Sequence, residues 1–314
     1  MYSIDWRKGW QAGLKTSWEL AKVVFPVTLL VQLVKHTPLM GWITQGLAPF
    51  MSWIGLPGEA AIPLVLGNIL NLYAGIGAVL TLDLTVKQVF IIALMLSFSH
   101  NLLIESALCK RVGVATWVVL LVRMGLAVLS ALLIHWLWIG GNERAVFAGI
   151  TPQESEPAGW FQIAQGALVT AAQGVITLVV IVIPLMMLIQ ILKDLRFLDW
   201  LSKGVAPLLR PFGIAPRGAV TLASGLLVGL FFGAGIIIQQ AEEQSFSRRD
   251  IHLLIIFLAA CHAVIEDTLI FVPLGIPVLH LLWIRFLAAV IVTLLVARFW
   301  KTPAVQPVAA VSGK

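Results

Sequence analysis

The chain contains the same apolar unit twice. The segment FPVTLLVQLVK, from Phe25 to Lys35, is matched 158 residues later by IPLMMLIQILK, from Ile183 to Lys193. A hydrophobic unit that occurs twice is typical of membrane proteins built from two related halves. The duplication therefore limits the fold to an arrangement in which one structural unit is used two times.

The repeat continues beyond this segment and includes charged residues. The same offset pairs Gly46 with Gly204, and a four-residue insertion then raises the offset to 162 residues. With the second offset, three polar or charged residues of each half correspond: His100 with His262, Glu105 with Asp267, and Arg123 with Arg285. Ionisable residues inside apolar segments mark a functional centre by default, and their recurrence indicates a centre to which both halves contribute.

The composition indicates that this chain folds in a lipid bilayer. Hydrophobic residues make up 60% of the chain and charged residues only 11%, whereas a soluble domain carries about a quarter charged residues. The apolar stretches reach the length of about 20 residues that a spanning helix needs, and the alternation of barrel strands is not evident. The net charge of +6 comes from basic loops, which the positive-inside rule explains better than nucleic-acid binding. We expect an all-α polytopic protein of the lipid bilayer, without a cleavable signal.

Each half divides into the same pieces. We expect a first repeat at 1–138, a connecting loop at 139–160, a second repeat at 161–300 and a disordered tail at 301–314. Within the repeats the pieces are, in order, a span with a central proline (17–35 and 162–192), an amphipathic helix (38–54 and 196–212), a glycine-broken apolar segment (58–82 and 217–240) and two further apolar helices (86–109 and 114–138, then 250–272 and 277–299).

The glycine-broken segment decides how the halves are oriented. If it crosses the membrane, the halves are parallel, and residues 36–57 and 193–217 share one side although the first has no Lys or Arg and the second has five. If it returns as a re-entrant or broken hairpin, each half has about three spans and the repeats have inverted topology. Fifteen basic residues then collect on the cytoplasmic side against three outside. We predict the inverted arrangement in a bacterial plasma (inner) membrane, with both termini cytoplasmic.

Amides and hydroxyls accompany the glycines of these segments. Asn68 and Asn71 lie in the first, and Thr221 and Ser224 in the second. Non-helical backbone at membrane depth persists only where protein or a water-filled cavity satisfies it, and half-helix ends can direct their dipoles at a solute. We interpret the segments as hairpins that form a substrate site. The alternative is that their small residues serve close helix packing alone.

The next helix of each half carries the other candidate substrate-binding residues. They are Ser99, His100, Asn101 and Glu105 in the first half, and His262, Glu266 and Asp267 in the second. On an intact helix, a histidine and an acid five positions apart lie about 140° apart, whereas His262 and Glu266 would share a face. A break beside the histidine would remove this restriction, but the sequence does not establish one.

Arg123 and Arg285 lie about nine residues into the helices that follow. An ionised arginine at this depth needs a partner, and the nearest carboxylates along the chain are Glu105 for the first, and Asp267 or Glu266 for the second. Such pairs either staple each helical hairpin or belong to the site. For the two histidines we favour a role in handling protons or a ligand.

These pieces together resemble the Gate, or nucleoside-recognition, family. The resemblance rests on the proline-containing helix, the amphipathic Gly-x-Ala-Pro segment, the glycine-broken hairpin and the histidine-bearing helix, and it spans about Trp10 to Trp300 as two fused Gate units. The family includes spore maturation proteins A and B, and is similar to parts of concentrative nucleoside transporters and of the ferrous-iron transporter. It implies that the hairpins line a central site faced by the histidines. Iron-transporter Gate segments use pore cysteines, whereas Cys109 and Cys261 are not at equivalent positions here.

The motifs of several other function classes are missing from the sequence. No nucleophile elbow, H-E-x-x-H helix or Walker loop occurs, so we expect no enzyme and no ATP-driven pump. We expect a secondary transporter or permease for a small polar solute, with alternating access around a midplane site and protons as the candidate coupling ion. No catalytic residue, cofactor or metal ligand is assigned, although a divalent-metal permease stays open as a subsidiary alternative. A non-transporting membrane scaffold is the alternative from another class, and formation of a homo-oligomer is left open.

Overall fold

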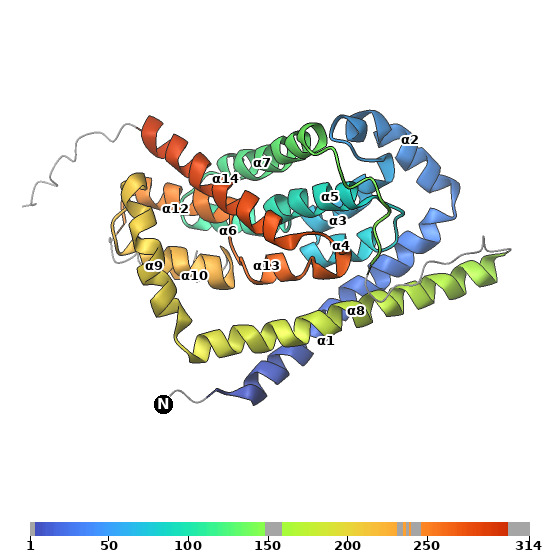
Figure 1. Cartoon of the computed structure of the whole chain (residues 1–314), viewed down its shortest axis with the longest axis horizontal. Coiled ribbons are helices and arrows are strands. Elements are labelled where there is room, and N and C mark those ends of the chain that lie inside the picture. Colours follow the sequence, from blue (N-terminus) through green and yellow to red (C-terminus); the bar gives the residue numbers. More distant parts are fainter. Residues whose placement is uncertain (1–3, 148–158, 231–234, 237–238, 240–245, 301–314) are drawn as a thin grey trace, which may run out of the picture.

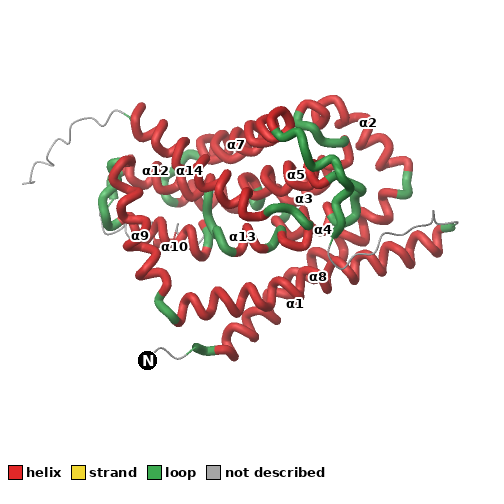
Figure 2. The backbone as a smooth tube through the Cα atoms, viewed as in Figure 1, coloured by secondary structure: helices red, strands yellow, loops and turns green. Residues whose placement is uncertain are grey.

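Helices form the regular structure of the chain. The computed structural model describes residues 4–147, 159–230, 235–236, 239 and 246–300, and among these it contains no strand (Figures 1 and 2). The helices of the first half are α1 (Trp6–Lys35), α2 (Pro38–Trp53), the 3-10 helix η1 (Gly58–Ala60), α3 (Ala61–Ile69), α4 (Leu72–Val79), α5 (Val86–Ser99), α6 (Leu102–Arg111) and α7 (Thr116–Leu137). Those of the second half are α8 (Trp160–Asp194), α9 (Phe197–Phe212), α10 (Gly218–Val228), α12 (Arg248–Ala260), α13 (Glu266–Leu269), η2 (Val272–Leu274) and α14 (Val278–Phe299).

The protein is an all-α polytopic membrane protein, as the composition predicts. Five helical stretches in the described part of the chain are long and apolar enough to cross a bilayer, and a sixth arises if the bent pair Pro38–Trp53 and Gly58–Ile69 counts as one span. Both amphipathic helices are present as α2 and α9. The predicted tail, 301–314, lies outside the described residues, as does 148–158 of the connecting loop.

Two of the expected apolar helices are not continuous. The sequence predicts single helices at 86–109 and 250–272, but α5 ends at Ser99 and α12 ends at Ala260. Both helices begin at matching capping boxes, which Thr85 and Ser247 form. The starts are thus fixed by local sequence. The breaks are stabilised by contacts with segments that are distant along the chain, as described below.

The central-proline helices, α1 and α8, pack against each other along one side of the molecule (Figure 1). A Cβ added to Gly9 would lie 3.2 Å from the Cα of Met187, and one added to Gly13 would lie 3.0 Å from the Cα of Ile183. Because the contact moves backward on α8 as it moves forward on α1, the two equivalent helices run antiparallel. This packing fits the predicted inversion, although the orientation of the halves across a bilayer stays a prediction.

The two halves share their hydrophobic cores. The first core consists mainly of first-half residues but takes Ile270, Phe271, Leu274, Ile276 and Leu281 from the second half. The second core consists mainly of second-half residues and takes Cys109, Val112, Val114, Val119 and Val122 from the first. With the offset of 162 residues, four of these pairs correspond. Each repeat therefore contributes the same segment to the core of the other, and the repeats interlock.

The first glycine-broken segment is a hairpin. In a continuous helix, Gly67 and Gly75 would be about 12 Å apart. A Cβ added to Gly75 would instead lie 3.1 Å from the Cα of Gly67 and 3.0 Å from the Pro63 carbonyl oxygen, so α4 folds back against α3. In the second half α10 corresponds to α3, whereas most of the expected return arm, within 217–240, lies outside the described residues.

Candidate functional site

The two histidines that are equivalent in the repeat, His100 and His262, lie at the helix breaks. His100 follows the last residue of α5, and His262 comes one residue after the cap of α12. The next residue in each half has left-handed backbone, with φ of 51° at Asn101 and 42° at Ala263. Such a conformation costs a residue with a Cβ about 1–2 kcal/mol, and strained backbone of this kind is often found at functional sites.

Main-chain hydrogen bonds tie each break to the end of a neighbouring helix. The Asn101 amide donates to the Gly67 carbonyl oxygen of α3 at 3.0 Å, and the Ala263 amide donates to the Gly225 carbonyl oxygen of α10 at 3.0 Å. The two glycines are equivalent in the repeat. Gly67 lies in the last turn of α3, where carbonyl groups lack intrahelical partners, whereas the Gly225 carbonyl oxygen also accepts from the Gly229 amide. Each break is thereby bonded to the end of a neighbouring helix.

The imidazole rings have a defined tautomer when neutral. Nδ1 of His100 lies 2.8 Å from the Leu96 carbonyl oxygen, and Nδ1 of His262 lies 2.7 Å from that of Leu258. A carbonyl oxygen can only accept, so Nδ1 carries the proton and Nε2 of each neutral ring carries a lone pair. The ring centroids are 5.3 Å apart, and both side chains are only 3% exposed.

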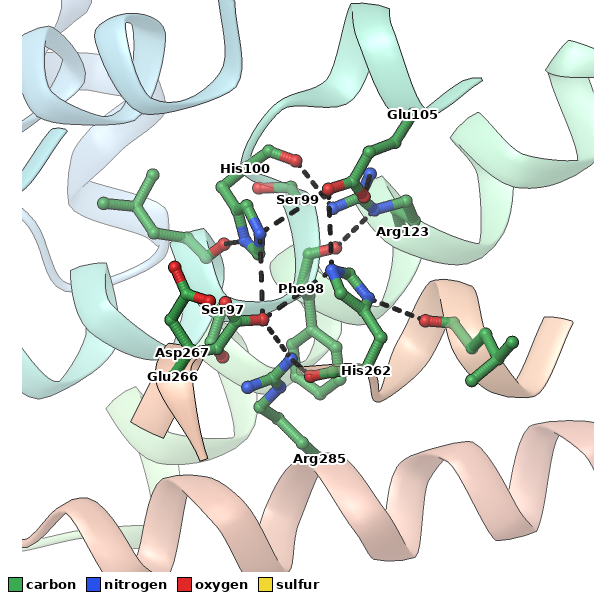
Figure 3. A network of polar contacts seen from close by, with 12 residues as sticks. Ser97, Phe98, Ser99, His100, Glu105, Arg123, His262, Glu266, Asp267 and Arg285 are labelled. Atoms are coloured by element: carbon green, nitrogen blue, oxygen red, sulfur yellow. Dashed lines mark hydrogen bonds and ion pairs between the residues drawn. The ribbon is translucent and has the colours of Figure 1, made fainter. Parts of the chain in front are cut away.

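One carboxylate from each half faces both histidines (Figure 3). Glu105 Oε1 lies 3.8 Å from His100 Nε2 and 3.5 Å from His262 Nε2. Asp267 Oδ2 lies 3.8 Å from His100 Nε2 and 3.6 Å from His262 Nε2. Each acid therefore reaches across to the histidine of the other half. We call His100, Glu105, His262 and Asp267 the central cluster.

Two fully buried arginines hold the cluster from outside. Arg123 lies 2.6 Å from Glu105 Oε2 and also donates to the carbonyl oxygens of Phe98 and His100, at 2.7 and 2.6 Å. Arg285 lies 2.9 Å from Asp267 Oδ2 and donates to the His262 carbonyl oxygen at 2.9 Å. The pairing of Arg123 with Glu105 agrees with the expectation from the sequence. For Arg285, Asp267 is the partner and Glu266 is not.

Glu266 has a different partner, which the sequence did not indicate. Its Oε1 accepts a hydrogen bond of 2.6 Å from the hydroxyl of Tyr73 in α4. The expectation that Glu266 shares a helical face with His262 is wrong, because α12 ends before the histidine and α13 begins at Glu266. The only hint of this bond in the sequence was a tyrosine, which can donate a hydrogen bond, among the glycines of the first hairpin. Its partner is 193 residues away and could not be found from spacing.

The remaining predicted site residues surround the cluster or shape the hairpins. Asn68 donates to the Leu64 carbonyl oxygen at 2.7 Å, the Asn71 side chain caps α4, and Ser99 donates to the Met95 carbonyl oxygen at 2.8 Å. These three side chains thus make local bonds. Thr221 and Ser224 are buried in α10, the helix whose end is bonded to Ala263. Solute binding by these residues stays a prediction.

The charges of this centre balance. Two guanidinium groups face two carboxylates, so these four groups together carry no net charge. An isolated buried charge would be prohibitively expensive, and pairing each one is what permits the centre to exist inside an apolar protein. The imidazole nitrogens and carboxylate oxygens that face one another are available to a proton or another cation.

Comparisons with known proteins agree with this architecture. The Gate family, described as nucleoside recognition, matches residues 17–132 and 175–282, one segment in each half. The chain belongs to the Gate family. Among its Gate relatives is the "Uncharacterized membrane protein YvoD" of Bacillus subtilis (strain 168), which is 50% identical over 293 residues and aligns over 93% of this chain and 94% of its own length. No solved structure matches the chain. Each Gate match includes one histidine of the central cluster, so the site lies between the two Gate units.

Proposed function

We propose that this protein is a secondary transporter or permease, which moves a small polar solute by rearrangement of its two Gate units around the central cluster. The observation that carries the proposal is the cluster itself. Two histidines and two carboxylates, one of each from either half, meet where two helices break inside a multi-pass protein. Broken helices and a site between repeats are the construction of many secondary transporters.

The energetic argument also supports a function beyond stability. Placing one charged residue at the centre of a membrane helix costs about 2.5–3.5 kcal/mol on insertion scales, and this chain brings together two buried arginines, the buried Asp267 and the largely buried Glu105. Hydrophobic residues of similar volume often replace a buried ion pair without loss, or with a gain of about 1–4 kcal/mol. A chain that needed only stable packing would have a less costly alternative.

Protons are the coupling ion that we propose for this transport. Histidine changes its charge within the physiological pH range, and each imidazole faces two carboxylate oxygens that a proton would bring into hydrogen bonding. We place the protein in the bacterial inner membrane with both termini in the cytoplasm, because the basic residues collect on that side in the inverted arrangement.

The family description makes nucleosides the first solutes to test, followed by peptides and organic acids. Each solute is added to purified protein, and those that raise the unfolding temperature are then tested for uptake into proteoliposomes with and without a pH gradient. We expect His262→Ala and Glu105→Gln to abolish uptake while the protein still folds. His252→Ala is the matched control, since His252 makes the same bond to the carbonyl oxygen four residues earlier but its ring lies against that of Trp300, 5.2 Å between centroids, and is not part of the cluster. Normal uptake by the His262 variant would refute the site assignment.

A membrane scaffold is the second candidate, and one observation favours it. Both arginines bond carboxylates of their own half, so these pairs fasten each helical hairpin to itself. The scaffold predicts that Arg123→Ala prevents folding or assembly and that the intact protein moves no solute. Uptake of any solute that depends on His262 would decide against it.

A further inference from the structure

The central cluster brings together four hydrogen-bond acceptor atoms, and the four residues supply no donor to one another, although Arg285 donates to Asp267 Oδ2 from outside the cluster. With Nδ1 of each neutral imidazole bonded to a carbonyl oxygen, both Nε2 lone pairs point toward Glu105 Oε1 and Asp267 Oδ2. Among the residues that the structure describes, Nε2 of His262 is buried and has no hydrogen-bond partner. Four electron-rich atoms facing one another repel unless a positive charge lies between them.

From this geometry we propose that the central cluster binds a divalent first-row transition-metal ion, with Zn²⁺ as the representative. The ligands are Nε2 of His100, Nε2 of His262 and a carboxylate oxygen of Asp267, completed by Glu105. One ligand atom from each of His100, His262 and Asp267 lies within 4.8 Å of the others. From the sequence, these residues belong to one candidate site and a divalent-metal permease stays a subsidiary alternative, but no metal ligand is assigned.

The distances suit an ion of this size. Tetrahedral ligands that lie about 2.0–2.1 Å from a zinc ion are about 3.3 Å from one another. The four nitrogen–oxygen distances in the cluster are 3.5, 3.6, 3.8 and 3.8 Å. The ligand atoms of His100, His262 and Asp267 lie within 4.8 Å of one another, so these side chains would move closer together to enclose the ion, and Glu105 would move to join them. A hydrogen-bonded pair would require a closer approach, with about 2.9 Å between the two atoms.

The surroundings of the cluster are also those of a metal site. Histidine ligands usually donate their second N–H to a carbonyl or carboxylate, which fixes the ring and its tautomer, and both histidines here donate to a backbone carbonyl oxygen. The ligating carboxylates are usually hydrogen-bonded as well. Arg123 and Arg285 hold the carboxylates of Glu105 and Asp267. The outer partners are therefore present in both halves.

The ligand set selects the class of ion. Imidazole nitrogen suits zinc, copper, iron and nickel, whereas magnesium and calcium prefer sites made of oxygen alone. Because the arginines already balance the carboxylates, a bound dication leaves the centre with excess positive charge. We therefore expect binding that is reversible and weaker than in a structural zinc site. The binding stands on the cluster geometry and does not require that the protein transports a solute.

The test is direct metal binding by the full-length protein in nanodiscs, after chelator treatment. Co²⁺ is titrated while its visible ligand-field absorption is recorded, and Zn²⁺ is then added to displace it. We expect one ion per chain, displacement by Zn²⁺, and no effect of Mg²⁺. For His262→Ala and Asp267→Asn we expect the dissociation constant to rise at least about 100-fold, since loss of an outer-shell partner alone costs 10–100-fold. For His252→Ala we expect no change.

Folding is checked separately for each variant by gel filtration and by its unfolding temperature, and Glu105→Gln gives a second variant if His262→Ala does not fold. Failure of the folded wild-type protein to bind Co²⁺ or Zn²⁺ would overturn the inference. So would equal binding by the wild-type protein and a folded cluster variant. Metal binding is measured without any uptake assay, so its result is independent of the transport test. If the uptake assays found no solute flux while the metal bound, the proposed transporter function would fail and the metal site would stand.

Discussion

The two buried arginines offer a quantitative test, because they are equivalent in sequence but not in their bonds. Arg123 has three partners: the Glu105 carboxylate and the carbonyl oxygens of Phe98 and His100. Arg285 bonds the Asp267 carboxylate and a single carbonyl oxygen, that of His262. Among the described residues its Nε and Nη1 have no hydrogen-bond partner, and neither has Nη1 of Arg123, which contacts Glu105 as an ion pair. Replacing each arginine with methionine, which is long and apolar, removes these bonds and leaves the backbone unchanged.

The magnitudes follow from the partners left behind. Either substitution leaves a buried carboxylate without its partner, which costs about 3–5 kcal/mol. Arg123→Met also leaves two carbonyl oxygens without their charged donor, whereas Arg285→Met leaves one. A hydrogen bond to a charged group contributes about 1.5–3 kcal/mol. We therefore expect Arg123→Met to reduce the free energy of unfolding by about 1.5–3 kcal/mol more than Arg285→Met does.

Equilibrium unfolding in mixed micelles, with helical circular dichroism as the signal, measures both free energies under the same conditions. The double variant Arg123→Met, Glu105→Gln serves as the control, because it removes the unpaired carboxylate and should recover part of the loss. Equal destabilisation by the two arginine variants, or a larger effect at Arg285, would refute the assignment of the extra carbonyl bond.

Three further predictions concern topology, packing and the link between the halves. Single cysteines at Gly46 and Gly204, equivalent exposed positions where an added side chain meets open space, should be labelled from opposite sides of the membrane; labelling from one side would contradict the inversion. Gly225→Ala should cost about 1–3 kcal/mol of unfolding free energy, because its Cβ would overlap a leucine methyl group of α12, and Gly204→Ala should show no such loss. Tyr73→Phe should reduce unfolding free energy by about 1.5–3 kcal/mol through loss of the bond to Glu266, and a stability equal to that of the wild-type protein would argue against that bond.

Local pattern and repetition were sufficient to predict much of this architecture. The capping boxes at Thr85 and Ser247 each involve residues only three positions apart in the sequence, and each is present where its helix begins. The pairing of Arg123 with Glu105 follows from two helices joined by a short turn, which limits the choice of partner. Such features depend on neighbours along the chain, so the sequence alone is enough to identify them.

The breaks at the histidines depend on distant contacts and could not be predicted. The apolar composition of residues 86–109 favours a continuous helix through Ser99. The chain leaves the helix there because the Asn101 amide finds the Gly67 carbonyl oxygen and Arg123 finds the His100 carbonyl oxygen. These bonds exist only after the hairpin and α7 have packed. The bond between Tyr73 and Glu266 could not be predicted either, because it too joins segments that are far apart along the chain.

The interlocked cores constrain how a transporter of this construction could move. If the two halves moved as separate rigid bodies, packing contacts in both hydrophobic cores would be lost, because each core contains a segment of the other half. The chain crosses from one core to the other at the breaks beside His100 and His262, and also within the continuous helices α7 and α14. The central cluster lies at the two crossings that are helix breaks, and α7 and α14 would have to accommodate any change of angle between the cores.

If the protein is a transporter of this construction, the two cores predict which distances change during transport. Gly46 lies on α2, which packs in the first core, and Gly204 lies on α9, which packs in the second. Spin labels on cysteines at these two positions should report a distance that changes when solute or a pH gradient is applied. A pair of labels on α2 and α5, which share the first core, should report a constant distance. If both pairs changed equally, the cores would deform internally, and the breaks would not be the hinges.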